Sequence, residues 1–124
     1  MPVLEMYEEF RVEFPELTAK SDIEHCKYWG EVDPEFAYSW FGSLANTLNK
    51  EMSRGIDVKT YKNQFEFFHS KYITGDSEVK NCIDVSFIEN LFWQVVPEKA
   101  LPYWQALPLP LKELYLDFYG HSPR

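Results

Sequence analysis

Residue types capable of acid–base, nucleophilic or metal chemistry are present in this sequence, but they form no recognised motif. The three histidines, His25, His69 and His121, lie far apart, and none belongs to the H-x-x-x-H or H-E-x-x-H pattern of a zinc site. There is no G-x-S-x-G turn and no glycine-rich phosphate loop. The sequence therefore predicts no catalytic residue, no metal site and no cofactor, and we expect a protein that is not an enzyme.

The pair His25–Cys26 comes nearest to a catalytic dyad, but neighbours in sequence point apart on a helix and rarely meet with useful geometry. An enzyme that uses a buried carboxylate with His25 or His69 is a minor alternative, and it requires a pocket that holds both groups. Cys82 lies in an apolar-periodic stretch, where we expect a buried thiol. Two cysteines without a C-x-x-C pair favour reduced thiols in the cytoplasm.

Acidic residues are concentrated at the start of the chain. The 124 residues carry 12 Lys and Arg against 20 Asp and Glu, a formal net charge of −8 with a pI near 4.8. Ten of the acids but only three of the bases fall within residues 1–35, so this segment holds −7 of the −8. Such a charge run is either a solvated face or an acidic surface that steers and docks a basic partner.

Composition excludes several classes of protein. So few Lys and Arg argue against binding to nucleic acid, which needs clustered positive charge. No apolar run reaches the roughly 18–20 residues of a membrane span, and the first ten residues do not resemble a secretory signal. Because 45% of the residues are apolar and 18% are aromatic, a packed core is expected.

Tyrosine and tryptophan side chains lie within the acidic segment, and these residue types commonly anchor protein interfaces. Trp29 stands beside Gly30 in an expected loop, whereas Trp40 lies on an apolar stripe and is expected in the core. The residues predicted to bind a partner are therefore Glu5, Glu8, Glu9, Glu13, Glu16, Asp22, Glu24, Tyr28, Trp29 and Glu31.

Apolar residues recur at helical spacing nearly everywhere, and no hairpin signal appears. We expect an all-α fold: residues 1–124 form one compact domain, a bundle of five to seven helices. The pattern predicts a helix over 4–14 that ends at Pro15, a short helix that begins at Ser21 or Asp22 and ends at Gly30, and a central helix over 34–52. Within the central helix, Gly42 suggests the close approach of a neighbouring helix.

Further helices are expected over 57–75 and from Asp76 or Ser77 to Val96, with Gly75 as a left-handed cap between them. Pro97 ends the latter and opens a short turn to Leu101. A proline-punctuated connector then packs Tyr103 and Trp104 onto the bundle, and a last helix over 111–118 ends at Gly120.

Two stretches resemble a family of small, acidic, helical bacterial proteins. One is Asn81–Leu91, of sequence NCIDVSFIENL, and the other is Leu107–Lys112, of sequence LPLPLK, with Tyr115 and Tyr119 after it. The resemblance covers about the last third of the chain. It implies a single helical domain, and many proteins of this kind are immunity proteins that neutralise a toxin of interbacterial competition.

Together these features predict a cytoplasmic binding protein of the immunity type, whose acidic surface blocks a basic toxin domain. Carboxylates would mimic phosphate charge if that partner is a nuclease. The alternative is an adaptor that binds a helix or peptide in an aromatic groove between the helices Phe36–Met52 and Val58–Tyr72. That alternative needs an exposed apolar groove at this position.

Overall fold

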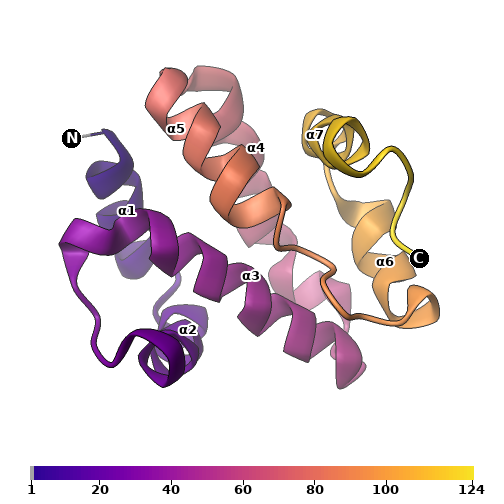
Figure 1. The fold of residues 1–124 in the computed structure, drawn as a ribbon, viewed down its shortest axis with the longest axis horizontal. Coiled ribbons are helices and arrows are strands. Elements are labelled where there is room, and N and C mark those ends of the chain that lie inside the picture. Colours follow the sequence, from indigo (N-terminus) through magenta and orange to yellow (C-terminus); the bar gives the residue numbers. More distant parts are fainter. Residues whose placement is uncertain (1) are drawn as a thin grey trace.

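A computed structural model describes residues 2–124 of the chain, and within them it is all-α, as predicted. Seven α-helices and three short segments follow one another: α1 (Pro2–Glu13), α2 (Pro15–Trp29), η1 (Pro34–Phe36), α3 (Ala37–Ser53), η2 (Val58–Tyr61), α4 (Lys62–Thr74), α5 (Ser77–Cys82), η3 (Ile83–Ile88), α6 (Pro97–Ala106) and α7 (Leu109–Tyr119). Here η1 and η2 are 3₁₀ turns and η3 is a π-helical turn. Figure 1 shows α3 crossing the molecule, with α1 and α2 towards one end and α6 and α7 towards the other.

Aromatic rings from α1, α3 and α4 form the centre of the core. Phe10 is fully buried and contacts five other rings, among them Trp40 at 5.7 Å and Phe68 at 5.6 Å between ring centres. Phe68 in turn stacks on Phe87 of η3 at 4.1 Å. Edge-to-face and offset pairs of this kind add about 0.5–1.5 kcal/mol each beyond the burial of their surface. Trp40 is therefore a core residue, as its place on the apolar stripe predicts.

Several predicted helix ends are confirmed by their caps. The side chains of Asp33, Asp57 and Asp76 accept hydrogen bonds from backbone amides in the first turns of η1, η2 and α5, at 2.9, 2.9 and 3.0 Å. Gly30 and Gly120 end α2 and α7 with φ of 82° and 79°, the left-handed conformation in which glycine is favoured.

The predicted start of the second helix is wrong. It begins at Pro15 rather than at Ser21 or Asp22 and continues unbroken to Trp29. Proline has no backbone N–H and so breaks a hydrogen bond inside a helix. At the first helical position the N–H would make no helical hydrogen bond in any case, so proline is tolerated there. Pro15 therefore ends α1 and starts α2 at once.

The predicted role of Gly75 is also wrong. Its φ is −75° and its ψ 162°, which is extended backbone and not a left-handed cap. The need for glycine is steric, because a Cβ here would lie 2.4 Å from the carbonyl oxygen of Lys71 and 2.6 Å from Cγ1 of Val79. Gly75 lets the chain turn tightly between α4 and α5.

The helix predicted to reach Val96 changes to a π-helix at Ile83 and ends at Ile88. α5 passes into the π-helical η3, and turns then carry the chain to Pro97, with positive φ at Phe92 (72°) and Gln94 (56°). Gly42 of α3 faces this region, and a Cβ there would lie 3.4 Å from Nδ2 of Asn90 and 3.5 Å from the carbonyl oxygen of Ser86. The close approach expected at Gly42 is confirmed.

The stretch after Pro97 is more helical than predicted. α6 runs for ten residues through Pro102, where a short turn and a connector were expected. Tyr103 is nevertheless buried, and its hydroxyl donates to the carbonyl oxygen of Ile56 at 2.7 Å. Trp104 is half-buried against Phe92 and Tyr115. α6 therefore packs both rings onto the bundle.

Candidate functional site

The carboxylates of α1 make one continuous acidic surface. Around the exposed side chain of Val12 lie four glutamates that border a shallow hollow of about 660 Å³: Glu5, Glu8, Glu9 and Glu13. Val12 itself is 84% exposed. This arises from the helical period, because Val3, Met6 and Phe10 on the opposite side of α1 are buried. We call Glu5, Glu8, Glu9, Val12 and Glu13 the acidic face.

An ion pair links one member of the acidic face to α4. The Lys71 ammonium pairs with the Glu9 carboxylate, and a second hollow extends from Glu9 and Glu13 over Phe67. Glu5, Glu8 and Glu13 are not among the ion pairs of the described residues, and all three are exposed. Three of the four glutamates thus present their charge directly to solvent.

Asp22 does not belong to this exposed surface. Arg11 donates two hydrogen bonds of 2.8 Å to its two carboxylate oxygens, and the indole Nε1 of Trp40 donates a third, also of 2.8 Å. Partial burial alone would raise the pKa of Asp22, but these donors outweigh it and the pKa is lowered. Asp22 therefore joins α1, α2 and α3.

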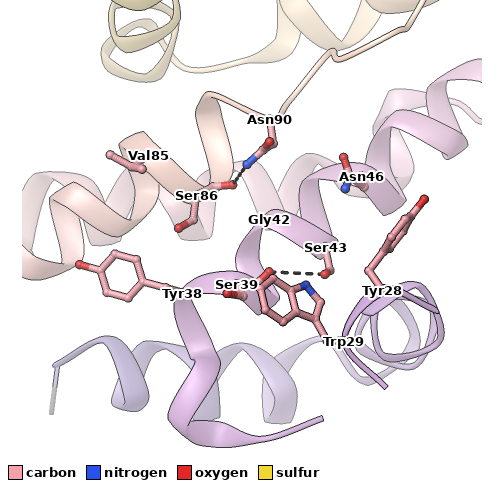
Figure 2. Close-up of a pocket in the computed structure, with 10 residues that line it drawn as sticks. All are labelled: Tyr28, Trp29, Tyr38, Ser39, Gly42, Ser43, Asn46, Val85, Ser86 and Asn90. Carbon is pink, nitrogen blue, oxygen red and sulfur yellow. Dashed lines mark hydrogen bonds between the residues drawn. The ribbon is translucent and has the colours of Figure 1, made fainter. Parts of the chain in front are cut away.

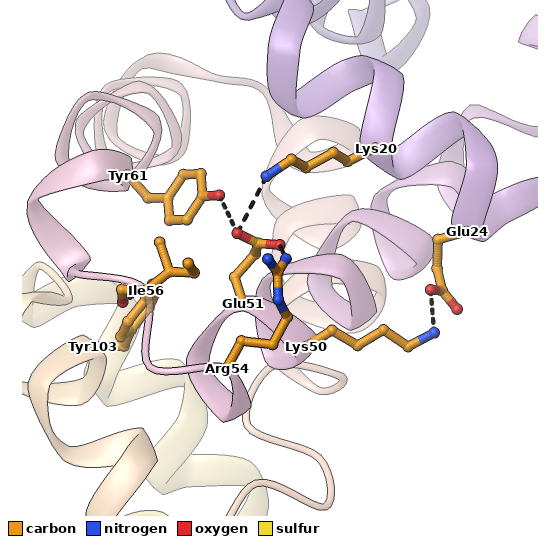
Figure 3. Close-up of polar contacts among 8 residues, drawn as sticks. All are labelled: Lys20, Glu24, Lys50, Glu51, Arg54, Ile56, Tyr61 and Tyr103. Carbon is orange, nitrogen blue, oxygen red and sulfur yellow. Dashed lines mark hydrogen bonds and ion pairs between the residues drawn. The ribbon is translucent and has the colours of Figure 1, made fainter.

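Glu24 is also turned inwards, although the sequence predicts it to bind a partner. Only 4% of the residue is exposed, and its Oε2 accepts from the Lys50 ammonium while Oε1 has no partner among the described residues. Figure 3 shows this pair beside a second buried carboxylate, Glu51. A charged group on a helix is expected in water, and the lysine on the adjacent helix is what allows burial. Glu24 is thus largely covered and paired, although it borders a hollow that Lys50 also lines.

Glu51 is the second such carboxylate and was not singled out from the sequence. Its Oε2 accepts from the Tyr61 hydroxyl at 2.7 Å and from the Lys20 ammonium at 3.3 Å, and its Oε1 accepts from Arg54 at 2.9 Å (Figure 3). Burial, together with the neighbouring Glu51 carboxylate, raises the pKa of Tyr61. Glu51 lies at a buried position of α3, but its sequence context resembles an ordinary exposed acid, so no local signal marks it.

The aromatic residues predicted to bind a partner, Tyr28 and Trp29, lie elsewhere, at the end of α2. They line a hollow of about 350 Å³ whose other sides come from α3 and from residues 85–90. Figure 2 shows Ser39, Ser43 and Asn46 on α3 across from Ser86 and Asn90. A neighbouring hollow of about 620 Å³ shares Tyr28 and Asn46 and extends to Lys50, Arg54 and Trp93. We call the two hollows together the Tyr28 cleft.

Trp29 is held from behind by a buried histidine. The two rings stack at 5.9 Å with 15° between their planes, and Nδ1 of His25 lies 2.8 Å from the Ser43 hydroxyl. Burial lowers the pKa of His25, so the neutral ring is favoured. His25 and Cys26 point apart, one buried and the other exposed, as adjacency on a helix predicts. His25 therefore supports the Trp29 ring.

The remaining predicted residues, Glu16 and Glu31, are exposed at the two ends of α2. Glu16 lies in the first turn, where a carboxylate also stabilises the helix dipole. Glu31 follows the Gly30 cap. Neither lines the hollow of the acidic face or the Tyr28 cleft. Eight of the ten residues predicted as one partner-binding set are thus divided among the acidic face, the internal ion pairs and the Tyr28 cleft, and Glu16 and Glu31 lie outside all three.

The aromatic groove predicted between α3 and α4 is filled. Phe41 and Phe68 are fully buried there and meet edge to face at 5.9 Å. The Tyr28 cleft lies instead between α2, α3, η3 and the segment that follows η3.

Within residues 2–124, no cluster of three or more His, Cys, Asp or Glu side chains is arranged to hold a metal ion. None of the helices described there combines the length and apolarity needed to cross a membrane.

Comparison with known proteins gives one match. Residues 7–120 match the model of a family described as "Domain of unknown function (DUF7674)". No curated protein and no solved structure matches the chain.

Proposed function

This chain belongs to the DUF7674 family, and we propose that it is a non-enzymatic binding protein whose acidic face docks a basic protein partner. The specific form that we propose is an immunity-type inhibitor, which neutralises a toxin in the cytoplasm of a bacterium. That form is supported by the resemblance of residues 81–91 and 107–119 to small helical bacterial proteins. The binding function is supported by the acidic face itself.

The observation that carries the proposal is the arrangement of four glutamates around an exposed valine. Glu5, Glu8 and Glu13 are exposed on one side of α1, and Val12 among them is 84% exposed. Charged rims steer encounter and select partners, while an apolar centre that loses water on contact supplies affinity. A basic surface with a small apolar contact at its centre complements this pattern.

The internal ion pairs determine which of the first two helices presents negative charge to solvent. Arg11 neutralises Asp22 and Lys50 neutralises Glu24, so α2 contributes less negative charge to solvent than its sequence suggests. The acids that stay exposed in the first two helices are mainly those of α1. A partner that responds to charge is therefore expected to approach α1.

The arrangement of the histidines favours binding over catalysis. His25 is 1% exposed and is engaged by Ser43 and Trp29. His69 lies 3.8 Å from the exposed carboxylate of Glu66 on the same helix, at the surface. The Ser43 hydroxyl that contacts His25 is only 5% exposed, and the Glu66 carboxylate near His69 lies in open solvent. Neither arrangement places an accessible pair of reactive groups in a closed pocket, as general acid–base catalysis requires.

The test is capture of the partner from the native host with three forms of the tagged chain. The acidic-face variant carries Glu5→Lys, Glu8→Lys and Glu13→Lys, which leaves the pair Glu9–Lys71 intact. The matched control changes the charge by the same amount at three exposed acids of α6 and α7: Glu98→Lys, Glu113→Lys and Asp117→Lys. We expect the wild type and the control to retain the same protein, and the acidic-face variant to lose it.

Co-expression of the captured partner in a susceptible cell tests the immunity form. We expect the partner to arrest growth, and the wild type and the control variant to restore it. Equal capture by all three forms would overturn the docking proposal. A captured partner that is harmless to the cell would overturn the immunity form and leave the binding function standing.

A further inference from the structure

The Tyr28 cleft is a second surface with the properties of a binding site, and it is separate from the acidic face. We propose that it binds an extended peptide that carries an apolar or aromatic side chain and, about three to five residues away, an Asp or Glu. The inference goes beyond the docking of a basic partner on α1 and does not depend on it. It relocates the peptide groove predicted between α3 and α4, a space that is filled by core rings.

One half of the cleft carries no charge and offers a rigid aromatic platform. Its hollow of about 350 Å³ is bordered only by aromatic, hydroxyl, amide and small apolar residues (Figure 2), in a chain of which 26% is charged. Trp29 is 55% exposed, yet its ring is backed by the buried His25. A large apolar surface that is already ordered loses little entropy when a ligand covers it. This half suits a neutral, apolar side chain.

The junction of the two hollows suits a peptide main chain. Asn46 borders both hollows, and its amide can donate and accept at once. An extended main chain presents the complementary donor and acceptor. Tyr28, which also borders both hollows, is 70% exposed and can cover the bound segment.

The other half of the cleft contains two exposed cations beside the Glu24 carboxylate, which also borders it but is largely buried. Lys50 and Arg54 border its hollow of about 620 Å³, and their side chains are 53% and 64% exposed. The carboxylates that hold them, Glu24 and Glu51, are buried beneath (Figure 3). Each cation therefore keeps hydrogen-bond donors free towards solvent, while its ion pair with a buried carboxylate fixes its position. These donors complement a carboxylate on the ligand.

Residues 93–95, which also border this hollow, follow a backbone of unusual conformation. Trp93 is 60% exposed and lies between Phe92 and Gln94, the two residues with positive φ. Strained backbone that persists next to a hollow is typical of ligand sites, and π-helical turns such as η3 are frequent there. The Asn49 side chain holds this segment by accepting from the amide of Phe92.

The spacing in the ligand comes from the geometry of α3. Trp29 stacks on His25, and His25 contacts Ser43 of α3, so the Trp29 ring lies beside this position of the helix. The cations Lys50 and Arg54 come seven and eleven residues later in the sequence. Seven to eleven residues of helix span about 10–16 Å at 1.5 Å each. An extended peptide covers that length in about three to five residues at 3.3 Å each. The apolar and acidic side chains of the ligand should therefore be separated by that number of residues.

Selection from a displayed library of random twelve-residue peptides on the immobilised whole chain tests the proposal. We expect a consensus that pairs an apolar or aromatic residue with Asp or Glu at this spacing. The dissociation constant of a synthetic consensus peptide is then measured by the fluorescence anisotropy of a dye attached to its end. Tyr28→Ala should weaken binding at least fivefold, and Arg54→Gln should weaken it and abolish the preference for the acidic residue.

Two controls separate this site from the rest of the surface. Phe118→Ala removes an aromatic ring of similar exposure, 56%, on α7 and should leave peptide binding unchanged. The acidic-face variant of α1 should also bind the peptide normally, so failure of either proposal is distinguishable from failure of the other. Absence of a consensus would overturn the inference, and so would equal peptide binding by the wild type and Tyr28→Ala. A cleft that binds carbohydrates through Trp29 but binds no peptide would also overturn it.

Discussion

The side chain of Asn49, on α3, accepts a hydrogen bond of 2.7 Å from the backbone amide of Phe92 and donates one of 2.9 Å to the carbonyl oxygen of Asn90. Asn49 is buried, and the backbone that it holds has left the helix. These two bonds replace the helical ones that the turns after η3 cannot make. Asn49 thereby positions Trp93 beside the Tyr28 cleft.

Replacement of Asn49 by Ala is expected to destabilise the protein by about 1–3 kcal/mol, because the buried amide of Phe92 loses its acceptor and the Asn90 carbonyl loses one of its donors. Asn49→Asp keeps an acceptor for the Phe92 amide but buries a charge and sets a carboxylate oxygen against the Asn90 carbonyl oxygen, so it should destabilise the protein at least as much at neutral pH. Urea unfolding followed by circular dichroism measures both free energies of unfolding. Asn46→Ala, one turn away but on the cleft, is the control and should change stability by less than about 0.5 kcal/mol.

Asp22 makes the free energy of unfolding depend on pH in the acidic range. Because its pKa is lowered in the folded protein, its contribution to stability is complete above the unfolded pKa of about 3.9 and is lost as the pH falls through the lower folded value. Asp22→Asn should cost about 1–3 kcal/mol at pH 7. The difference from the wild type should shrink below about pH 4. A difference that stayed constant from pH 7 to pH 3 would contradict the role given to the Arg11 and Trp40 donors.

The two cysteines should differ sharply in reactivity. Cys26 is exposed, whereas Cys82 is fully buried and burial raises its pKa to about 12. A thiol reagent at pH 8 should label one cysteine in the folded protein and both in denaturant. Cys26→Ser should abolish labelling of the folded protein. Labelling of that variant at an appreciable rate without denaturant would show that Cys82 is accessible.

Gly75→Ala tests whether the turn between α4 and α5 needs space rather than a left-handed backbone. The added methyl group would meet the Lys71 carbonyl oxygen and the Val79 side chain at less than 3 Å, so we expect a loss of about 1–3 kcal/mol. At Gly120, where φ is 79° and no atom lies within 4 Å of the added Cβ, alanine should cost about 1 kcal/mol from strain alone. Thermal unfolding of the two variants compares them directly.

Local signals predicted most of the fold. Asp33, Asp57 and Asp76 are caps whose chemistry depends on residues two or three positions away, and the apolar stripe of α3 is visible in the sequence itself. The errors arose where tertiary contacts override the local pattern. The residues after Ile88 continue a helical stripe, but Asn49 from a distant helix stabilises another conformation.

The candidate site was less predictable than the fold for the same reason. The period of α1 places Glu5, Glu8 and Glu13 on its solvent side, so the acidic face follows from spacing alone. The burial of Glu24 and Glu51 depends on Lys50, Lys20 and Tyr61, which come from other helices or other turns. Charge in the sequence therefore overstates the charge that α2 presents to solvent.

The dissociation constant for the captured partner, measured by calorimetry at about 0.05 M and about 0.5 M salt, tests the central claim most directly. If the acidic face docks the partner, the wild type should bind at least tenfold more weakly at the higher salt. The variant Glu5→Lys, Glu8→Lys, Glu13→Lys should bind at least tenfold more weakly at the lower salt and depend little on salt. Equal constants for wild type and variant at both concentrations would contradict the claim.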